Sequence, residues 1–310
     1  MKIAIMGAGG VGGYLGGKLA AAGGDVTFIA RGAHLQAIRK QGLRICGVEN
    51  MHLPKVRASD TPTEIGIVDT VLFCVKLYDT ESATKAIAPI TGPNTSVLTL
   101  QNGIESVREI GSVIGAKAML GGAAYFPASI TAPGEVTFNG KIAACPHVAF
   151  GEPGGGDSSR VQELLSVFRA AGVDADGCAD TDLMLWEKFL LIAGTSAATA
   201  VTRCNIGTVR NDPDMRWLLR ESVAEAERVG ARAGVVFGAD VVDQVVATID
   251  TNPANGKASQ LVDLENGRRL ELEWFSGAIV RLGKKLEVPT PVHATIYAAL
   301  KPFRDGVPAV

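Results

Sequence analysis

Residues 1–23 are MKIAIMGAGGVGGYLGGKLAAAG, a short apolar run followed by an abrupt glycine-rich turn and then by small residues at helical spacing. The run at residues 3–6 predicts a buried strand, and residues 11–22 predict a helix directly after the turn. A strand, a turn and a helix in this order form the first unit of an open parallel sheet. The stretch therefore predicts a Rossmann-type α/β domain.

The glycines in the turn have the spacing G-x-G-x-x-G, and each has a physical role. Gly7 permits the tight turn, Gly9 lets the backbone approach a pyrophosphate, and Gly12 lets the helix pack closely on the strand. The helix amino terminus attracts the phosphates. We therefore predict that this loop binds a dinucleotide through Gly7, Ala8, Gly9, Gly10, Val11 and Gly12. The alternative is a glycine-rich turn that binds no ligand.

Residues 25–30 predict the second strand, and the residue after it suggests which dinucleotide is bound. An NAD site usually has an acidic side chain here for the ribose 2′-hydroxyl. This chain has Arg31 instead. A guanidinium matches a 2′-phosphate in charge and in donor geometry, so Arg31 predicts NADP (NADPH) as the cofactor. The alternative is a solvated surface arginine.

Two further strands are predicted at residues 70–76 and 95–103, with a helix near 79–90 between them. Each strand ends at a polar side chain, Lys76 in one case and Asn102 in the other. Ligands of open parallel sheets lie beyond the carboxyl ends of the strands, so we expect both side chains to contact cofactor or substrate. The alternatives are a surface cation at Lys76 and a simple turn at Asn102.

The rest of the amino-terminal half alternates between apolar and polar residues. Residues 117–141 and 147–153 predict extra antiparallel strands that close the sheet. The glycine-rich segment 151–159 predicts a flexible connector before a helix at 160–171, because the strand–glycine–helix spacing does not recur there.

From about residue 180 the strand-like alternation gives way to long helical periods. We therefore predict a dinucleotide-binding domain at 1–179 and an all-helical domain at 180–310. We expect a small ligand to bind in a cleft between the domains, where such ligands usually lie.

Lys188 lies in the segment DLMLWEKFLLIAGTSAATA (182–200), at the start of a long uncharged run that predicts a buried helix. A buried ammonium needs a partner or a task. At the head of a helix facing the expected cleft, it could donate a proton to a carbonyl oxygen while a hydride reaches the carbon. Such a cation stabilises the alkoxide that forms from a 2-oxo acid. The alternative is a lysine whose stem packs while its head reaches water.

The bulk composition argues against several classes of protein. The chain has 310 residues, 47% of them hydrophobic, and a formal net charge of −2, which favours a soluble two-domain protein that binds neither nucleic acid nor membranes. Five dispersed cysteines predict free thiols in a reducing compartment, and the start at Met1 leaves no room for a targeting segment, so we expect a cytoplasmic protein. No metal-like spacing occurs. The histidines at 34, 52, 147 and 293 are expected on the surface or in loops.

Several motifs occur in order along the chain and together resemble one family. They are GAGGVG (7–12), Arg31, CVK (74–76), LQNG (100–103), LWEK (185–188) and ELEWFSGAIVRLGKKLEVPTP (271–291). With them the sequence resembles the ketopantoate reductase (2-dehydropantoate 2-reductase) family over nearly its whole length. The resemblance implies a Rossmann domain followed by a helical domain like that of 6-phosphogluconate dehydrogenase. It also implies NADPH-dependent reduction of ketopantoate to pantoate, on the route to pantothenate and coenzyme A.

The resemblance also implies site residues. Lys188 matches the proton donor, and Glu271 matches a second catalytic carboxylate, although alone it would be a solvated helix acid. Ser259 matches the serine that holds the substrate carboxylate, and Asn102 matches an asparagine near the nicotinamide and substrate. Ser196 takes the place of a substrate-binding asparagine and could still donate one bond.

Two further positions depart from the family pattern. Ile192 and Gly256 stand where the family has asparagines, and Asn255 is one place away from the second. A missing hydrogen bond to a buried polar group costs about 1–3 kcal/mol, so the pocket could prefer a more apolar 2-oxo acid. A paralogous reductase of another branched 2-oxo acid and a non-catalytic NADP-sensing protein are the alternatives. A homodimer also stays open.

Overall fold

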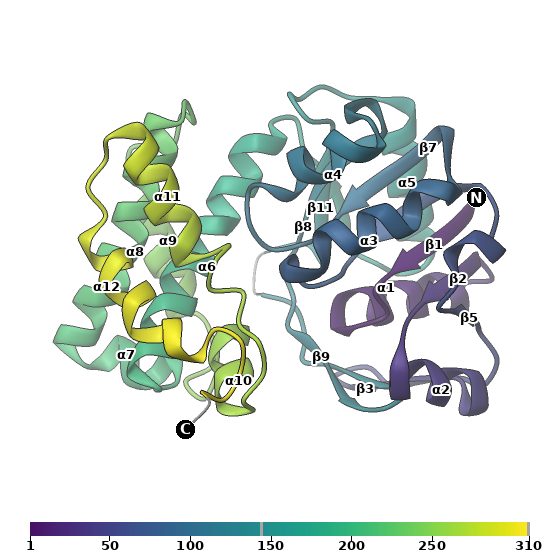
Figure 1. Cartoon of the computed structure of the whole chain (residues 1–310), viewed down its shortest axis with the longest axis horizontal. Helices are drawn as coiled ribbons and strands as arrows, with labels where there is room; N and C mark the ends of the chain where they lie inside the picture. The colour runs from purple at the N-terminus through teal and green to yellow at the C-terminus, as the bar shows by residue number, and fades with distance from the viewer. Residues whose placement is uncertain (143–144, 309–310) are drawn as a thin grey trace. The chain divides into compact units, whose positions relative to one another are not determined.

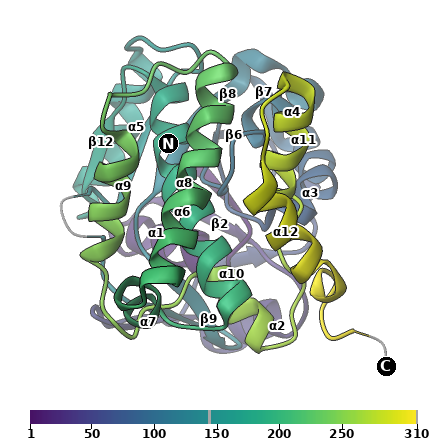
Figure 2. The same ribbon diagram turned by 90° about the vertical axis from the view of Figure 1, so that its left-hand side faces the viewer.

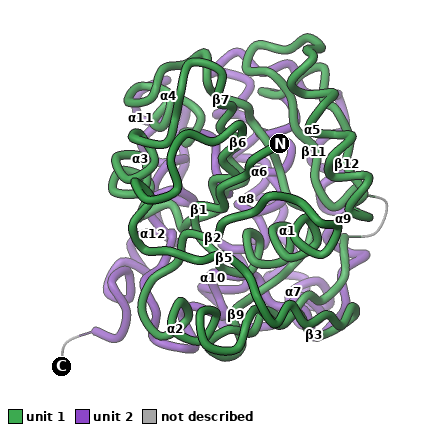
Figure 3. Tube along the Cα trace, turned by 90° about the vertical axis from the view of Figure 1, so that its right-hand side faces the viewer, with its two compact units in different colours: residues 1–101, 105–182 green, residues 102–104, 183–310 purple. Residues whose placement is uncertain are grey.

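The computed structural model describes residues 1–142 and 145–308. The chain forms two compact units, drawn in two colours in Figure 3. The first contains residues 1–101 and 105–182, and the second contains residues 102–104 and 183–310. A strand-rich first unit and a helical second unit confirm the predicted combination of a Rossmann-type domain with an all-helical domain (Figure 1).

Within the described residues, the main sheet of the first unit has eight strands in the order β12-β11-β8-β7-β6-β1-β2-β5. The strands from β8 to β5 in this order are parallel, β11 runs antiparallel to β8, and β12 is parallel to β11. Their bounds are β1 (Lys2–Met6), β2 (Asp25–Ile29), β5 (Arg57–Ser59), β6 (Val68–Phe73), β7 (Thr91–Thr99), β8 (Met119–Ala124), β11 (Val148–Gly151) and β12 (Ala175–Gly177).

Helices cover both faces of this sheet. Side chains alternate along each strand, so each face carries apolar side chains on which helices pack. Ile3 and Ile5 of β1 pack in one core with α1 (Gly10–Ala21) and α5 (Ser159–Ala170). Ala4 packs in the opposite core with α3 (Thr80–Ile87) and α4 (Ser106–Ile114). Continuous apolar strands such as residues 3–6 are typical of a sheet that is buried on both faces.

A second, four-stranded sheet corrects one prediction. The described strands β4-β3-β10-β9 form a separate sheet, so residues 128–138 do not close the main sheet as the alternation suggested. β10 pairs in parallel with β3, which lies far away in sequence, and local periodicity carries no information on such a partner. The bounds are β3 (Leu43–Gly47), β4 (Met51–Leu53), β9 (Ala128–Ala132) and β10 (Glu135–Phe138), and α2 (Gly32–Gln41) precedes β3.

Aromatic packing joins α1 to this second sheet. The Tyr14 ring of α1 stacks on Phe138 of β10 with centroids 4.1 Å apart and meets Phe126 edge-on at 5.0 Å. The Tyr14 hydroxyl donates to Glu49 Oε1 at 3.0 Å, and Lys18 pairs with the other carboxylate oxygen. The helix that begins at the glycine loop therefore packs against the main sheet on one side and against the second sheet on the other.

The second unit is a group of helices (Figure 2). Their bounds are α6 (Thr181–Thr202), α7 (Ile206–Asn211), α8 (Pro213–Arg232), α9 (Val241–Asp250), α10 (Ser259–Glu265), α11 (Ser276–Leu286) and α12 (Pro291–Leu300). The helix α8 contacts α7, α9, α11 and α12. Across residues 1–142 and 145–308, each helix is either too short or too polar to traverse the hydrocarbon core of a bilayer.

A buried polar network ties three of these helices together. The Glu225 carboxylate of α8 accepts the backbone N–H groups of Val292 and His293, both at 2.8 Å, and so caps the start of α12. The His293 ring is fully buried between Ser276 of α11 and the Ser222 carbonyl of α8. The expectation that His293 lies at the surface was therefore wrong. A single histidine in a helical pattern gives no local sign of such partners.

Candidate active site

The carboxyl ends of the central strands meet at one edge of the main sheet. Gly7 N–H donates to Ile29 O at 3.1 Å, and Cys74 N–H donates to Met6 O at 2.8 Å. Leu100 N–H continues the row by donating to Phe73 O at 3.0 Å. The segments after β1, β2 and β6, which supply the predicted cofactor residues of this unit, therefore begin at the same edge as the segment after β7, and such folds bind their ligands at this edge.

The glycine loop has the geometry that a pyrophosphate requires. Gly7 has φ +95°, which favours glycine, and an added Cβ at Gly12 would overlap the Gly7 carbonyl oxygen. An added Cβ at Gly9 would have no described atom within 4 Å, so this part of the backbone is open to a ligand. Helical bonding begins with Gly13 N–H to Gly9 O at 2.7 Å, which leaves the first-turn amides of α1 for phosphate oxygens.

His34 supports this loop, although the sequence analysis expected it at the surface or in a loop. It lies in the first turn of α2 and is half-buried. Its Nδ1 accepts the Gly134 N–H at 3.0 Å, so the proton of a neutral ring is on Nε2, which donates to Ala8 O at 2.8 Å. Burial lowers the pKa of His34, which keeps the ring neutral. The distant partner Gly134 left no signal in the sequence.

Gln101 is a second supporting residue that the sequence analysis did not assign. Its buried side-chain amide donates to Val75 O at 3.1 Å and to Thr80 Oγ1 at 2.8 Å. These bonds tie the end of β7 to the segment that carries Lys76, which is half-buried and precedes a short 3₁₀ helix (Leu77–Asp79). These bonds fix the backbone beside Lys76 at the carboxyl edge of the sheet.

Arg31 follows β2, as predicted, and precedes α2. Its side chain is 79% exposed and donates from Nη2 to Asp79 Oδ2 at 2.6 Å. An exposed guanidinium at this edge is accessible to an anionic group of a nucleotide. Asp79 was not singled out from the sequence, because its partner lies 48 residues earlier in the chain.

In the second unit, Lys188, Ile192 and Ser196 lie at i, i+4 and i+8 of α6 and so share one face of the helix. Lys188 is 8% exposed and Ser196 is 2% exposed, while Ile192 is half-buried. The prediction that Lys188 heads its helix was wrong, since α6 begins at Thr181. An acidic first-turn residue, Asp182, favours this earlier start.

Glu271 and Glu273 are close in sequence but have different surroundings. Glu271 is 4% exposed and lies in the turn before α11, so it is not the solvated helix acid that the sequence alone suggested. Glu273 accepts the Tyr297 hydroxyl at 2.7 Å and also pairs with Arg281 and Arg304. Of these two carboxylates, only Glu271 is buried.

The remaining predicted substrate residues lie in less enclosed places. Ser259 is exposed at the start of α10, and Asn102 is half-buried in a bend before Gly103, whose φ is +107°. Asn102 belongs to the second unit although it follows β7 in sequence. Gly256 lies in a tight turn, where an added Cβ would be 2.9 Å from the Pro253 carbonyl oxygen. This crowding explains why the turn disfavours an asparagine there.

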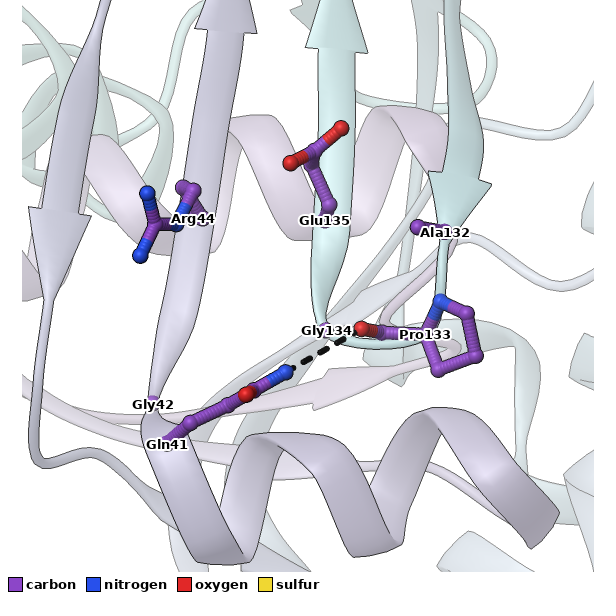
Figure 4. Close-up of a pocket in the computed structure, with 7 residues that line it drawn as sticks. All are labelled: Gln41, Gly42, Arg44, Ala132, Pro133, Gly134 and Glu135. Carbon is purple, nitrogen blue, oxygen red and sulfur yellow. Dashed lines mark hydrogen bonds between the residues drawn. The ribbon is translucent and has the colours of Figure 1, made fainter.

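A hollow on the second sheet is separate from these residues (Figure 4). In the figure the Gln41 side chain reaches across it to the Pro133 carbonyl, at 3.5 Å. Arg44 and Glu135 lie on the neighbouring strands β3 and β10. The hollow contains none of the residues predicted to bind cofactor or substrate, and its turn at Gly134 is the one that holds His34.

Comparison with known proteins identifies the family. The family model "Ketopantoate reductase PanE/ApbA" matches residues 3–145, and the model of its C-terminal part matches residues 180–304. A 2-dehydropantoate 2-reductase of Mesorhizobium japonicum is 32% identical over 97% of this chain and 97% of its own length. The chain belongs to the ketopantoate reductase family. Ketopantoate reductases are oxidoreductases that act on CH–OH groups.

Solved structures agree with this membership. The PanE/ApbA family ketopantoate reductase of Ralstonia eutropha JMP134 has a TM-score of 0.89 and 32% identity, with 98% of each chain covered. A ternary complex of D-mandelate dehydrogenase with NADH and anilino(oxo)acetate has a TM-score of 0.88 at 21% identity, with 98% of each chain covered, which shows a shared fold. One fold therefore serves enzymes of different names, and the substrate must be argued from side chains.

Proposed function

We propose that this ketopantoate reductase family member uses NADPH to reduce ketopantoate (2-dehydropantoate) to pantoate, a step toward pantothenate and coenzyme A. The main support is Lys188, a cationic residue that is 8% exposed and lies on a helical face shared with Ser196. Burial of a cationic side chain is costly, which supports a chemical task for this lysine. In this family the matching lysine supplies the proton of the reduction.

The cofactor assignment rests on the first unit. We propose that the backbone of Gly7, Ala8, Gly9, Gly10, Val11 and Gly12 holds the pyrophosphate, since the Gly9 position is open and the Gly12 position is closed to side chains. Arg31 is proposed to bind the 2′-phosphate, because a forked guanidinium prefers a phosphate dianion to a hydroxyl. Lys76 adds a cation to the same edge, and Asn102 is proposed to contact both cofactor and substrate.

When bound, a reduced nicotinamide supplies a hydride to the C2 carbonyl carbon. Lys188 is proposed to donate a proton to the carbonyl oxygen and to stabilise the negative charge that develops on it. The reaction requires the nicotinamide and Lys188 to act on the same carbonyl. Glu271 is proposed to accept a hydrogen bond from the substrate hydroxyl. Ser259 and Ser196 are proposed to donate hydrogen bonds to the substrate, Ser259 to its carboxylate.

The test is steady-state turnover of NADPH with ketopantoate and with a panel of 2-oxo acids of different polarity. The proposal predicts the largest kcat/KM for ketopantoate and a lower KM for NADPH than for NADH. A larger kcat/KM for an apolar 2-oxo acid would transfer the assignment to a paralogous reductase. Equal binding of NADH and NADPH would remove the role of Arg31.

Ile192 is the observation that favours such a paralogue. An isoleucine on the helical face of Lys188 and Ser196 cannot hydrogen-bond a substrate hydroxyl. The substitution Ile192→Asn is expected to raise kcat/KM for ketopantoate relative to an apolar 2-oxo acid by about 5- to 100-fold, the value of one hydrogen bond to a buried polar group. An unchanged ratio would show that Ile192 does not contact the substrate.

A further inference from the structure

The ion pair of Arg31 with Asp79 has a consequence for how the cofactor is chosen. The Arg31 side chain is 79% exposed, whereas that of Asp79 is 23% exposed. The contact joins Arg31 Nη2 to Asp79 Oδ2 at 2.6 Å, and it connects the segment after β2 to the short 3₁₀ helix (Leu77–Asp79) that follows β6. Both groups belong to the first unit. The carboxylate therefore lies beside the cation that is proposed to bind the 2′-phosphate.

The Asp79 backbone is fixed, but its side chain has no capping role in the described structure. Asp79 N–H donates to Lys76 O at 2.9 Å, and Asp79 O accepts the Ser82 hydroxyl at 3.0 Å. Asp79 occupies the N-cap position of α3, yet its carboxylate makes no capping hydrogen bond there. The carboxylate is thus turned toward Arg31 instead of toward its own helix.

We propose that Asp79 is a specificity-determining residue that lowers the preference of this protein for a 2′-phosphorylated nucleotide. It does so by competing with the 2′-phosphate for the Arg31 guanidinium. This inference rests on the proposed role of Arg31. A phosphate that binds Arg31 must replace or share the contact with Asp79, and it must also approach a second negative charge. A 2′-hydroxyl meets neither penalty, so the Arg31–Asp79 ion pair reduces the difference in binding affinity between NADPH and NADH.

The expected size follows from the charges. In water, two unit charges about 6 Å apart change an equilibrium constant by about threefold, and a phosphate monoester carries about 1.5 to 2 charges at neutral pH. Binding of the phosphate also breaks an exposed ion pair, which weakens the affinity for the 2′-phosphate by roughly a further 1.4- to fivefold. Some pre-ordering of Arg31 by Asp79 opposes these effects. We therefore expect a net effect of about three- to tenfold.

The experiment measures nucleotide binding by titration calorimetry and needs no catalysis. Wild type and Asp79→Asn are titrated with adenosine 2′,5′-bisphosphate (2′,5′-ADP) and with 5′-AMP, which differ only in the 2′-phosphate, at about 50 mM salt. Asp79→Asn is expected to tighten the binding of 2′,5′-ADP by about three- to tenfold and to leave the Kd of 5′-AMP within about twofold of wild type. At about 1 M salt the gain should largely disappear, since the Debye length falls to about 3 Å.

Two controls make the outcomes distinct. Glu81→Gln removes a charge from the same helix. Because Glu81 pairs with Lys85 and not with Arg31, this variant should leave the Kd of both nucleotides unchanged. Arg31→Ala should weaken the binding of 2′,5′-ADP and leave the binding of the nucleotide without the 2′-phosphate unchanged. Asp79→Ser, which also removes the carboxylate, should reproduce Asp79→Asn if that variant is poorly folded.

Each result decides the matter. Unchanged or weaker 2′,5′-ADP binding in the Asp79 variants, with Arg31→Ala still selective, overturns the inference and leaves the NADPH proposal intact. Equal tightening of both nucleotides also overturns the inference. If Arg31→Ala leaves 2′,5′-ADP binding unchanged, the proposed role of Arg31 fails, and the inference fails with it.

Discussion

His34 donates a hydrogen bond from Nε2 to the carbonyl oxygen of Ala8 at 2.8 Å, and this bond joins α2 to the centre of the glycine loop. The other ring nitrogen accepts from Gly134 at 3.0 Å, so the loop is connected through one imidazole to the turn between β9 and β10. A glycine loop has little conformational restraint of its own. Its shape therefore depends partly on a side chain from outside the motif.

Removing this support should weaken cofactor binding. His34→Ala is expected to raise the Kd for NADPH by about fivefold, the value of one hydrogen bond near 1 kcal/mol, with a smaller change in kcat. The pKa of His34 is lowered below its ordinary value of 6.5, so the ring stays neutral at and somewhat below pH 6.5, and its contribution to binding is lost only as pH falls through the lowered pKa. Fluorescence titration of NADPH between pH 5 and 8 checks both points. An unchanged Kd in His34→Ala would exclude the supporting role.

The glycines of the loop should separate folding from binding. Gly12→Ala adds a Cβ that overlaps the Gly7 carbonyl oxygen and lies 2.9 Å from Ile5 Cγ2, so it should destabilise the fold by about 1–3 kcal/mol or more. Gly9→Ala has open space and should keep the wild-type Tm. It should still weaken NADPH binding at least about tenfold, because the methyl group occupies the approach of the pyrophosphate. Thermal unfolding and titration of both variants check this contrast.

Burial of His293 should make the helical unit sensitive to acid. Burial lowers the pKa of His293 from 6.5 to about 4. Because the unfolded chain binds the proton more readily, the free energy of unfolding is highest above pH 6.5. It should fall by up to about 3 kcal/mol between pH 6.5 and 4. In urea unfolding, His293→Gln should flatten this decline. The same slope in wild type and variant would assign the acid sensitivity to other groups.

Two neighbouring carboxylates should differ in their effect on turnover. Glu271→Gln is expected to lower kcat by about 10- to 100-fold, since it removes a buried charge from the proposed catalytic pair, a loss of about 1.5–3 kcal/mol. Glu273→Gln changes an ion-pair network with Tyr297, Arg281 and Arg304 and should leave kcat within about twofold. A larger loss of kcat in Glu273→Gln than in Glu271→Gln would reverse this assignment.

Local sequence patterns predicted the features whose causes are local. The strand at residues 3–6, the glycine turn and the helix after it were confirmed, since the positive φ of Gly7 and the close packing at Gly12 lie within the motif itself. The change to helices in the second half was also confirmed. The five cysteines are free thiols, as their spacing predicted.

The features that sequence reasoning missed depend on distant partners. β10 pairs with β3, His34 meets Gly134, and Glu225 caps α12 from another helix. None of these contacts has a periodic signature, because each joins segments far apart in the chain. The start of α6 was missed for a different reason. The uncharged run that begins after Lys188 suggests a helix start there, although Asp182, an acidic residue of the first turn, indicates an earlier start.

The most direct measurement is kcat for NADPH-dependent ketopantoate reduction in wild type and Lys188→Ala, with NADPH affinity measured alongside. Lys284→Ala, which removes an exposed lysine from α11, is the control. We expect Lys188→Ala to lower kcat by about 10²- to 10⁴-fold with NADPH affinity within about threefold of wild type, and Lys284→Ala to match wild type. Wild-type turnover in Lys188→Ala would contradict its proposed role as the proton donor.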